Sequence, residues 1–225
     1  MYLILNLLLL PIWIYIFIKA NKKSKKEIII CGILFGIAAV VISKMYSLVD
    51  YWHPKFILNG FLLEDFIYGF IFGGISSEIT EVIFKVREKH SEKKRYYLGI
   101  LFFVITVCTF LLIVNVLHIR SIFAHIIPPL IVGIICIIYD KRYLNITLIS
   151  GLLLLLITMI YQNILLFIYP NLFNDFWYTS NLLGIYILRI PIEELLFAFS
   201  LGFGASCFYE LIMGKIYTKK KNMIK

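Results

Sequence analysis

The chain has 225 residues, of which 61% are hydrophobic and only 16% charged, and its mean hydropathy is +0.92. This composition leaves too little polar surface for a soluble globular domain, and several apolar runs reach the roughly 20 residues that span a bilayer. The net charge of +9 comes from Lys and Arg clusters between the apolar runs. Because these clusters are not interleaved with exposed aromatic residues, nucleic-acid binding is not expected.

Seven apolar segments are predicted to be transmembrane helices. In chain order they cover residues 2–18, 28–47, 58–84, 97–117, 121–139, 144–169 and 181–214. When the connections are assigned to alternate sides of a membrane, 18 of the 22 Lys and Arg residues fall on one side. Since positively charged loops stay in the cytoplasm, we expect a multi-pass protein of the cell membrane with its N-terminus outside and its C-terminus in the cytoplasm.

Two pairs of adjacent acidic residues stand near the start of long apolar runs. They are Glu64-Asp65 and, 129 positions later, Glu193-Glu194. A charged carboxylate at the centre of a membrane helix costs roughly 2.5–3.5 kcal/mol, so repeated pairs indicate a functional site. Capping of a helix N-terminus is the simplest structural explanation, but it accounts for one acid better than for two pairs.

The similarity between the two segments extends along the chain. Asp50-Tyr51-Trp52 precedes the first acidic pair, and Asp175-Phe176-Trp177 precedes the second. Further matches at the 129-residue offset are Gly73 with Gly202, Ser77 with Ser206, and Glu81 with Glu210. We therefore predict an all-α fold with two parallel repeats, arranged 3+1+3: residues 1–95 and 121–225 form three-helix repeats, and 96–120 form a linking transmembrane helix.

The residues around the second acidic pair resemble a known family. The lycopene cyclase domain of bacterial, archaeal and fungal carotenoid cyclases has Pro-x-Glu-(Glu/Asp) at the start of a transmembrane helix, and this chain has Pro191-Ile192-Glu193-Glu194. The resemblance covers about residues 30–85 and 145–215, as in the fused two-half form of the family. The first half departs from the motif, because Leu62 stands where the proline is expected.

This resemblance implies an isomerase that uses no cofactor. A terminal alkene of a linear, lycopene-type carotenoid is protonated, the carbocation closes on a neighbouring alkene, and a proton is lost. Because an alkene is a weak base, the donor must be a neutral carboxyl, which burial and a second nearby acid both favour. Glu193 is the leading candidate for this acid, Glu194 tunes its proton affinity, and Glu64 with Asp65 supplies the partner site or the base.

Aromatic side chains are the expected surroundings of a carbocation, which they stabilise without trapping it. The candidate substrate-binding residues are Trp52, Tyr68, Trp177 and Phe197, together with Asp50 and Asp175. A Trp or Tyr near a helix end is also typical of an interfacial anchor. The two aspartates either orient a polar network at the outer side or solvate a loop.

No metal site is predicted, because His118 and His125 lie seven residues apart without a nearby acidic partner. Glu81 and Glu210 are expected at the cytoplasmic end, in ion pairs with the nearby Lys85 and Lys215. Another acid, Glu78, has no counterpart in the second half, where Cys207 stands at the matching position.

Two other functions fit this architecture. Small seven-helix transporters of the parallel-repeat type are built in the same way, and buried acids can couple protons to transport. The helix centres here consist mostly of Ile, Leu and Phe, which favours a cavity for a lipid-like molecule. A non-catalytic isoprenoid-binding protein is the third possibility.

The expected partners are the bilayer and a hydrophobic isoprenoid or carotenoid, and a homo-oligomer or a complex with other carotenoid enzymes fits this setting.

Overall fold

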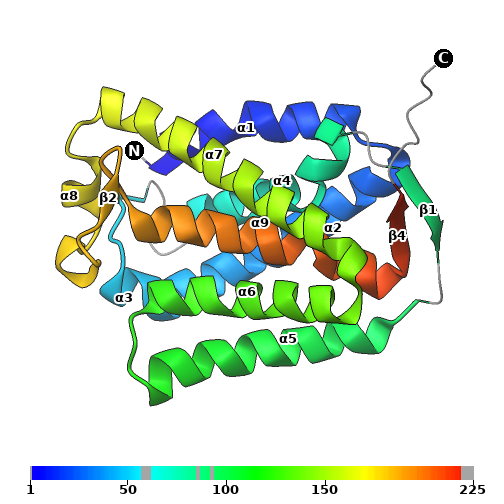
Figure 1. The fold of residues 1–225 in the computed structure, drawn as a ribbon. Coiled ribbons are helices and arrows are strands. Elements are labelled where there is room, and N and C mark those ends of the chain that lie inside the picture. The colour runs from blue at the N-terminus through cyan, green and yellow to red at the C-terminus, as the bar shows by residue number, and fades with distance from the viewer. Residues whose placement is uncertain (1, 57–61, 85–86, 92–93, 219–225) are drawn as a thin grey trace.

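The computed structural model describes residues 2–56, 62–84, 87–91 and 94–218, and it shows a bundle of helices (Figure 1). The α-helices are α1 (Tyr2–Lys19), α2 (Lys22–Ile42), α3 (Leu48–Asp50), α4 (Leu63–Phe84), α5 (Tyr96–Leu111), α6 (Ser121–Tyr139), α7 (Leu144–Ile168), α8 (Leu172–Phe176) and α9 (Ile192–Met213). The π-helical turns are η1 (Ser43–Ser47) and η2 (Leu112–Val116), and the 3-10 turns are η3 (Lys141–Tyr143) and η4 (Thr179–Asn181). The predicted all-α class is confirmed.

Two short antiparallel strand pairs lie in the connections between helices. Strand β1 (Arg87–Ser91) pairs with β4 (Lys215–Thr218), and β2 (Tyr186–Ile187) pairs with β3 (Ile190–Pro191). The first pair joins the segment after α4 to the segment after α9, and the second forms a tight hairpin immediately before α9.

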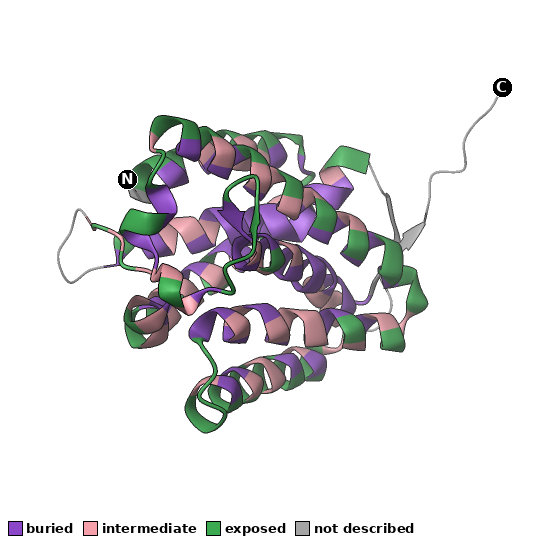
Figure 2. Ribbon diagram, turned by 60° about the vertical axis from the view of Figure 1, so that its left-hand side comes forward, coloured by how far each residue is buried: buried purple, intermediate pink, exposed green. Residues whose placement is uncertain are grey.

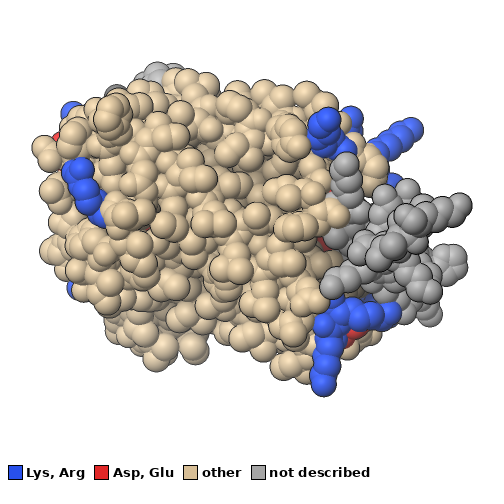
Figure 3. Space-filling view, turned by 45° about the horizontal axis from the view of Figure 1, so that its top comes forward, with Lys and Arg blue, Asp and Glu red and all other residues tan. Residues whose placement is uncertain are grey.

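Six helices in the described part of the chain are long and apolar enough to cross a membrane. They cover Lys22–Asp50, Leu63–Phe84, Tyr96–Val116, Ser121–Tyr139, Lys141–Ile168 and Ile192–Met213. The first predicted span corresponds to α1, which is apolar but shorter. These helices identify a membrane protein. On the face shown in Figure 3, the Lys and Arg residues lie at the two ends of the molecule and the band between them is uncharged.

The last predicted span was placed too early in the chain. It was expected to begin at residue 181, but α9 begins at Ile192, after η4 and the β2–β3 hairpin. Leu188 and Arg189 form the hairpin turn with φ values of 51° and 68°, the left-handed conformation that two-residue hairpin loops require. The hairpin and the residues just before it are rich in Leu and Ile, so composition alone does not separate them from the membrane helix that follows.

Helices α4 and α9 form the centre of the bundle. Both have 22 residues, and their bounds differ by the predicted offset of 129 positions. About two-thirds of their apolar windows (67%) are buried, against 22–44% in the other candidate spans. They contact each other; α1 and α2 pack on α4, whereas α6 and α7 pack on α9. Figure 2 shows the buried residues gathered at the middle of the bundle.

The two halves use the same kind of contact between helices. In the first half, a Cβ on Gly32 of α2 would lie 2.8 Å from the ring of Phe70 in α4. In the second half, a Cβ on Gly151 of α7 would lie 2.8 Å from the ring of Phe199 in α9. The two phenylalanines are 129 positions apart, so α2–α4 and α7–α9 pack through matching contacts. Each contact needs a residue without a side chain to let the backbones approach.

Candidate active site

The two loops with the related Trp-containing signatures lie side by side. Trp52 and Trp177 form an antiparallel β-bridge, and their ring centroids are 5.9 Å apart. The backbone N–H of Tyr178 donates to the carbonyl oxygen of Tyr51 at 3.0 Å. These bonds fix the loop that precedes α4 against the loop that precedes α9, so the starts of both central helices meet at one end of the bundle.

A cavity of about 220 Å³ lies beneath these loops. Residues from both halves and from α5 line it, and most of them are apolar. The lining includes one member of each acidic pair, Asp65 and Glu194, but neither Glu64 nor Glu193. Asp65 and Glu194 stand 129 positions apart, so the corresponding member of each pair faces the same space.

Three donors hold the carboxyl of Glu194, which lies in the first turn of α9 and is buried. The Tyr51 hydroxyl donates to Oε1, and the indole Nε1–H of Trp177 donates to the same oxygen at 2.8 Å. The amide Nε2–H of Gln162, from α7, donates to Oε2 at 2.7 Å. The paired loops and α7 therefore fix the orientation of this carboxyl.

Tyr51 keeps its proton in this arrangement. Burial raises the pKa of Tyr51 well above its ordinary value. Since a raised pKa favours the neutral phenol, Tyr51 remains a hydrogen-bond donor throughout the physiological pH range.

The neighbouring residue, Glu193, has different surroundings. Its side chain is fully buried, and Oε1 accepts a hydrogen bond from the backbone N–H of Leu183. Adjacent residues on a helix point about 100° apart, and of this pair only Glu194 lines the cavity. Glu193 ties the loop before β2 to the start of α9.

The acidic pair of the first half divides in the same way. Asp65 is buried and lines the cavity, whereas Glu64 is buried outside its lining. The backbone carbonyl oxygen of Glu64 accepts a hydrogen bond from Asn6 of α1 at 3.1 Å. This bond connects α1 to the first turn of α4.

All four aromatic candidates from the sequence line the cavity: Trp52, Tyr68, Trp177 and Phe197. The two aspartates in the same group of candidates do not. The carboxylate of Asp50 accepts hydrogen bonds from the backbone N–H of Ser121, at 2.8 Å, and from its hydroxyl. Asp175 is exposed and accepts a hydrogen bond from the Tyr169 hydroxyl. Asp50 therefore caps the start of α6, and Asp175 stabilises a surface loop.

Two residues of the site, His125 in the cavity lining and Gln162 beside Glu194, were not among the candidates from the sequence. His125 of α6 lines the cavity, and its Nε2 lies 2.9 Å from Oγ of Ser47 in η1. An isolated histidine without metal-ligand spacing gives no signal in a single sequence, and its partner lies 78 positions away. Gln162 did give a signal, because an amide inside the long apolar run of α7 needs a buried partner.

Comparison with known families adds to this geometry. Residues 120–212 match the family model for lycopene cyclase. This segment is therefore similar to the lycopene cyclase family. The match contains α6, α7 and most of α9, and with them Gln162, Trp177 and Glu194. The chain matches no curated protein and no solved structure. The resemblance is thereby confirmed for the second half, whereas its extension to the first half remains a prediction.

Proposed function

We propose that this protein cyclises the end groups of linear, lycopene-type carotenoids by proton transfer inside the cavity. The lycopene cyclase match supports cyclisation as the reaction class. The observation that carries the proposal is that Asp65 and Glu194, from corresponding positions in the two halves, line one mostly apolar cavity. Such a cavity excludes water, which would otherwise trap a carbocation.

Glu194, rather than Glu193, is the proton donor in this proposal. Only Glu194 of the two lines the cavity. Before reaction, the apolar surroundings favour a neutral carboxyl that can protonate an alkene. As the proton leaves, negative charge develops on the carboxyl, and Tyr51, Gln162 and Trp177 already point their donors at it. Donors arranged in advance for a developing charge lower the barrier to the step.

Asp65 is the proton acceptor in the same proposal. The π electrons of the terminal alkene take the proton of Glu194, and the resulting cation is attacked by the neighbouring alkene, which forms the ring C–C bond. The ring cation then loses a C–H proton to Asp65, and the electrons of that C–H bond form the new double bond. The reaction changes no oxidation state overall and consumes no cofactor. Before the next turnover, Asp65 releases this proton to solvent and Glu194 takes up another proton from solvent.

The aromatic lining and the size of the cavity fit one end of a carotenoid. Trp52, Tyr68, Trp177 and Phe197 present rings to the cavity, and the faces of such rings attract a cation. A volume of about 220 Å³ is below the roughly 300–1,000 Å³ of pockets that enclose a whole drug-sized ligand. The cavity therefore takes a single end group, while the rest of the polyene extends into the surrounding bilayer.

The membrane arrangement that accompanies this function has seven spans. In it α1 crosses the bilayer as a short span, and residues 1–95 and 121–225 form parallel three-helix repeats joined by a linking helix within 96–120. The contacts of α4 with α1 and α2, and of α9 with α6 and α7, support this 3+1+3 arrangement. The Lys and Arg distribution supports a cytoplasmic C-terminus in the cell membrane.

Expression in cells that accumulate lycopene tests the proposal. The unmodified chain is expected to produce cyclic carotenoids, and Glu194→Gln is expected to lower their yield at least ~100-fold, the usual contribution of a general acid. Asp175→Asn, which also converts a carboxyl to an amide but at an exposed position, is the matched control and should retain activity. Absence of cyclic product from the unmodified chain, or full activity of Glu194→Gln in correctly folded protein, would contradict the proposal.

A further inference from the structure

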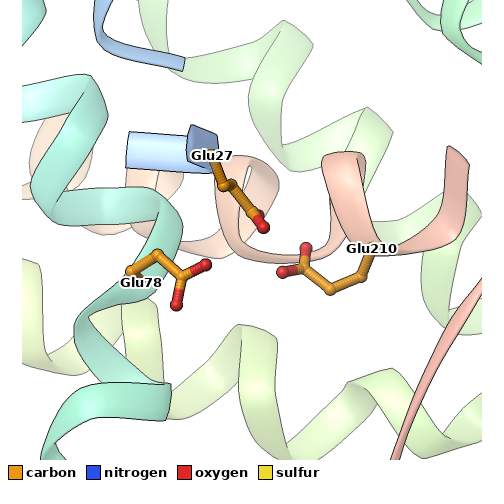
Figure 4. Close-up of side chains that lie close together, drawn as sticks. All are labelled: Glu27, Glu78 and Glu210. Atoms are coloured by element: carbon orange, nitrogen blue, oxygen red, sulfur yellow. The ribbon is translucent and has the colours of Figure 1, made fainter. Parts of the chain in front are cut away.

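A second group of buried acids lies at the opposite end of the helices from the cavity. Glu27 of α2, Glu78 of α4 and Glu210 of α9 are all fully buried (0% exposed). Each contributes a carboxylate oxygen to a set in which all oxygens lie within 4.8 Å of one another (Figure 4). Glu210 follows Glu193 by 17 positions on one helix, about 25 Å at 1.5 Å per residue. The ion pair expected between Glu210 and Lys215 stays a prediction, because the Lys215 side chain lies outside the described residues.

A second observation, at Glu78, points to a ligand of the cluster. Its carboxylate points towards Glu27 and Glu210 (Figure 4), and neither of its oxygens accepts a hydrogen bond from a donor in the described part of the chain. The groups that interact with it are themselves carboxyls, those of Glu27 and Glu81. Buried like charges that face one another are strongly unfavourable unless a positive charge or a proton neutralises them.

We propose that Glu27, Glu78 and Glu210 bind a hard divalent cation of the Mg²⁺, Mn²⁺ or Ca²⁺ class. Carboxylate oxygens are the ligands that these ions prefer. With metal–oxygen distances of about 2.0–2.6 Å, two ligands on opposite sides of the ion are about 4–5 Å apart. The three carboxylate oxygens are at most 4.8 Å apart, so all of them can contact one ion with side-chain adjustment alone.

The bound cation ties the two halves of the protein together. Glu27 and Glu78 belong to the first half, whereas Glu210 belongs to the second, so the ion adds a link between α4 and α9 at the end of the bundle far from Glu194. The internal repeat aligns Glu81 with Glu210 at the 129-residue offset. It does not account for this cluster, because Glu27 and Glu78 have no acidic counterparts in the second half. The cluster is thus an addition to the repeated architecture, and its role does not depend on the cyclase proposal.

Binding of Mn²⁺ to the full-length protein in detergent tests the inference. The protein is stripped with EDTA, and Mn²⁺ is added while the electron paramagnetic resonance signal of free Mn²⁺ and the thermal midpoint are recorded. We expect saturable uptake of one Mn²⁺ per chain and a midpoint about 5–10 °C higher at 100 times the dissociation constant. Competition with Mg²⁺ and Ca²⁺ shows which ion binds most tightly. No uptake and an unchanged midpoint would mean that the acids hold only protons, which overturns the inference.

Two substitutions locate the binding. Glu78→Gln and Glu210→Gln should each weaken Mn²⁺ affinity at least ~10-fold, because each removes a charged ligand. Glu193→Gln makes the same change at a buried glutamate at the other end of α9 and should leave the affinity unchanged. Unchanged affinity in both cluster variants would place the ion elsewhere and contradict the assignment. Because the readout is metal uptake, its outcome is independent of any test of cyclase activity.

Discussion

At the scale of single residues, the structure assigns different surroundings to carboxyls that look alike in the sequence. The sequence identifies both acidic pairs, and it also predicts Trp52 and Trp177, which line the cavity. It cannot show which member of each pair faces inward, because neighbouring helix positions differ by about 100° and the rotation of the helix is set by tertiary packing. The proposed donor therefore changes from Glu193 to Glu194.

Removal of one donor to Glu194 provides a prediction at this scale. Tyr51→Phe deletes a hydroxyl that stabilises the developing carboxylate and leaves the ring in place. A hydrogen bond to a charged group contributes about 1.5–3 kcal/mol, so the turnover rate should fall about 10- to 100-fold. Rates of ring formation in isolated membranes measure the effect.

The matched control for Tyr51→Phe is Tyr169→Phe. This change removes a hydroxyl that donates to the exposed Asp175, away from the cavity. It should leave the rate of ring formation unchanged. Equal rates in the two variants would show that the Tyr51 hydroxyl does not support the chemistry.

At the scale of helices and strands, hydropathy locates the spans better than their ends. The predicted segment 121–139 coincides with α6, since Arg120 and Asp140 bound its apolar run. The start of α9 was misplaced because the β2–β3 hairpin is apolar, and the turn η1 leaves no composition signal although Ser47 in it contacts His125. The close contacts of Gly32 and Gly151 with phenylalanine rings become visible only in the structure.

A glycine at a helix crossing provides a prediction at this scale. Gly151→Ala places a Cβ 2.8 Å from the ring and 3.0 Å from the backbone oxygen of Phe199. Overpacking of this kind destabilises a protein by about 1–3 kcal/mol. Thermal unfolding in detergent should show a lower midpoint for this variant.

Gly99→Ala is the control for the crossing. Its Cβ would meet the flexible end of Ile212 at 3.0 Å, and the next atoms lie at 3.7 Å or more. Both variants gain the same helix propensity, so the difference between their midpoints reports the packing alone. Equal midpoints would show that the α7–α9 crossing tolerates a side chain.

At the scale of the whole molecule, the bundle separates two clusters of acids. At one end, the paired loops bring Asp65 and Glu194 to a shared cavity, and at the other end Glu27, Glu78 and Glu210 converge. The sequence predicted that the acidic pairs of the two halves lie near each other, because duplicated helices place their acids on one face of the membrane. The sequence did not predict the cluster of Glu27, Glu78 and Glu210. Their spacing along the chain gives no sign that they are neighbours, and only the packing of α2, α4 and α9 brings them together.

Deuterium transfer tests most directly the claim that a cavity carboxyl protonates the substrate. Membranes that contain the protein are equilibrated in D₂O, supplied with lycopene, and the products are analysed by mass spectrometry. Because the proton on Glu194 exchanges with solvent between turnovers, each ring formed by the unmodified protein should carry one deuterium, and Glu194→Gln should form almost no rings. Rings without deuterium, or rings formed at the normal rate by Glu194→Gln, would contradict the account.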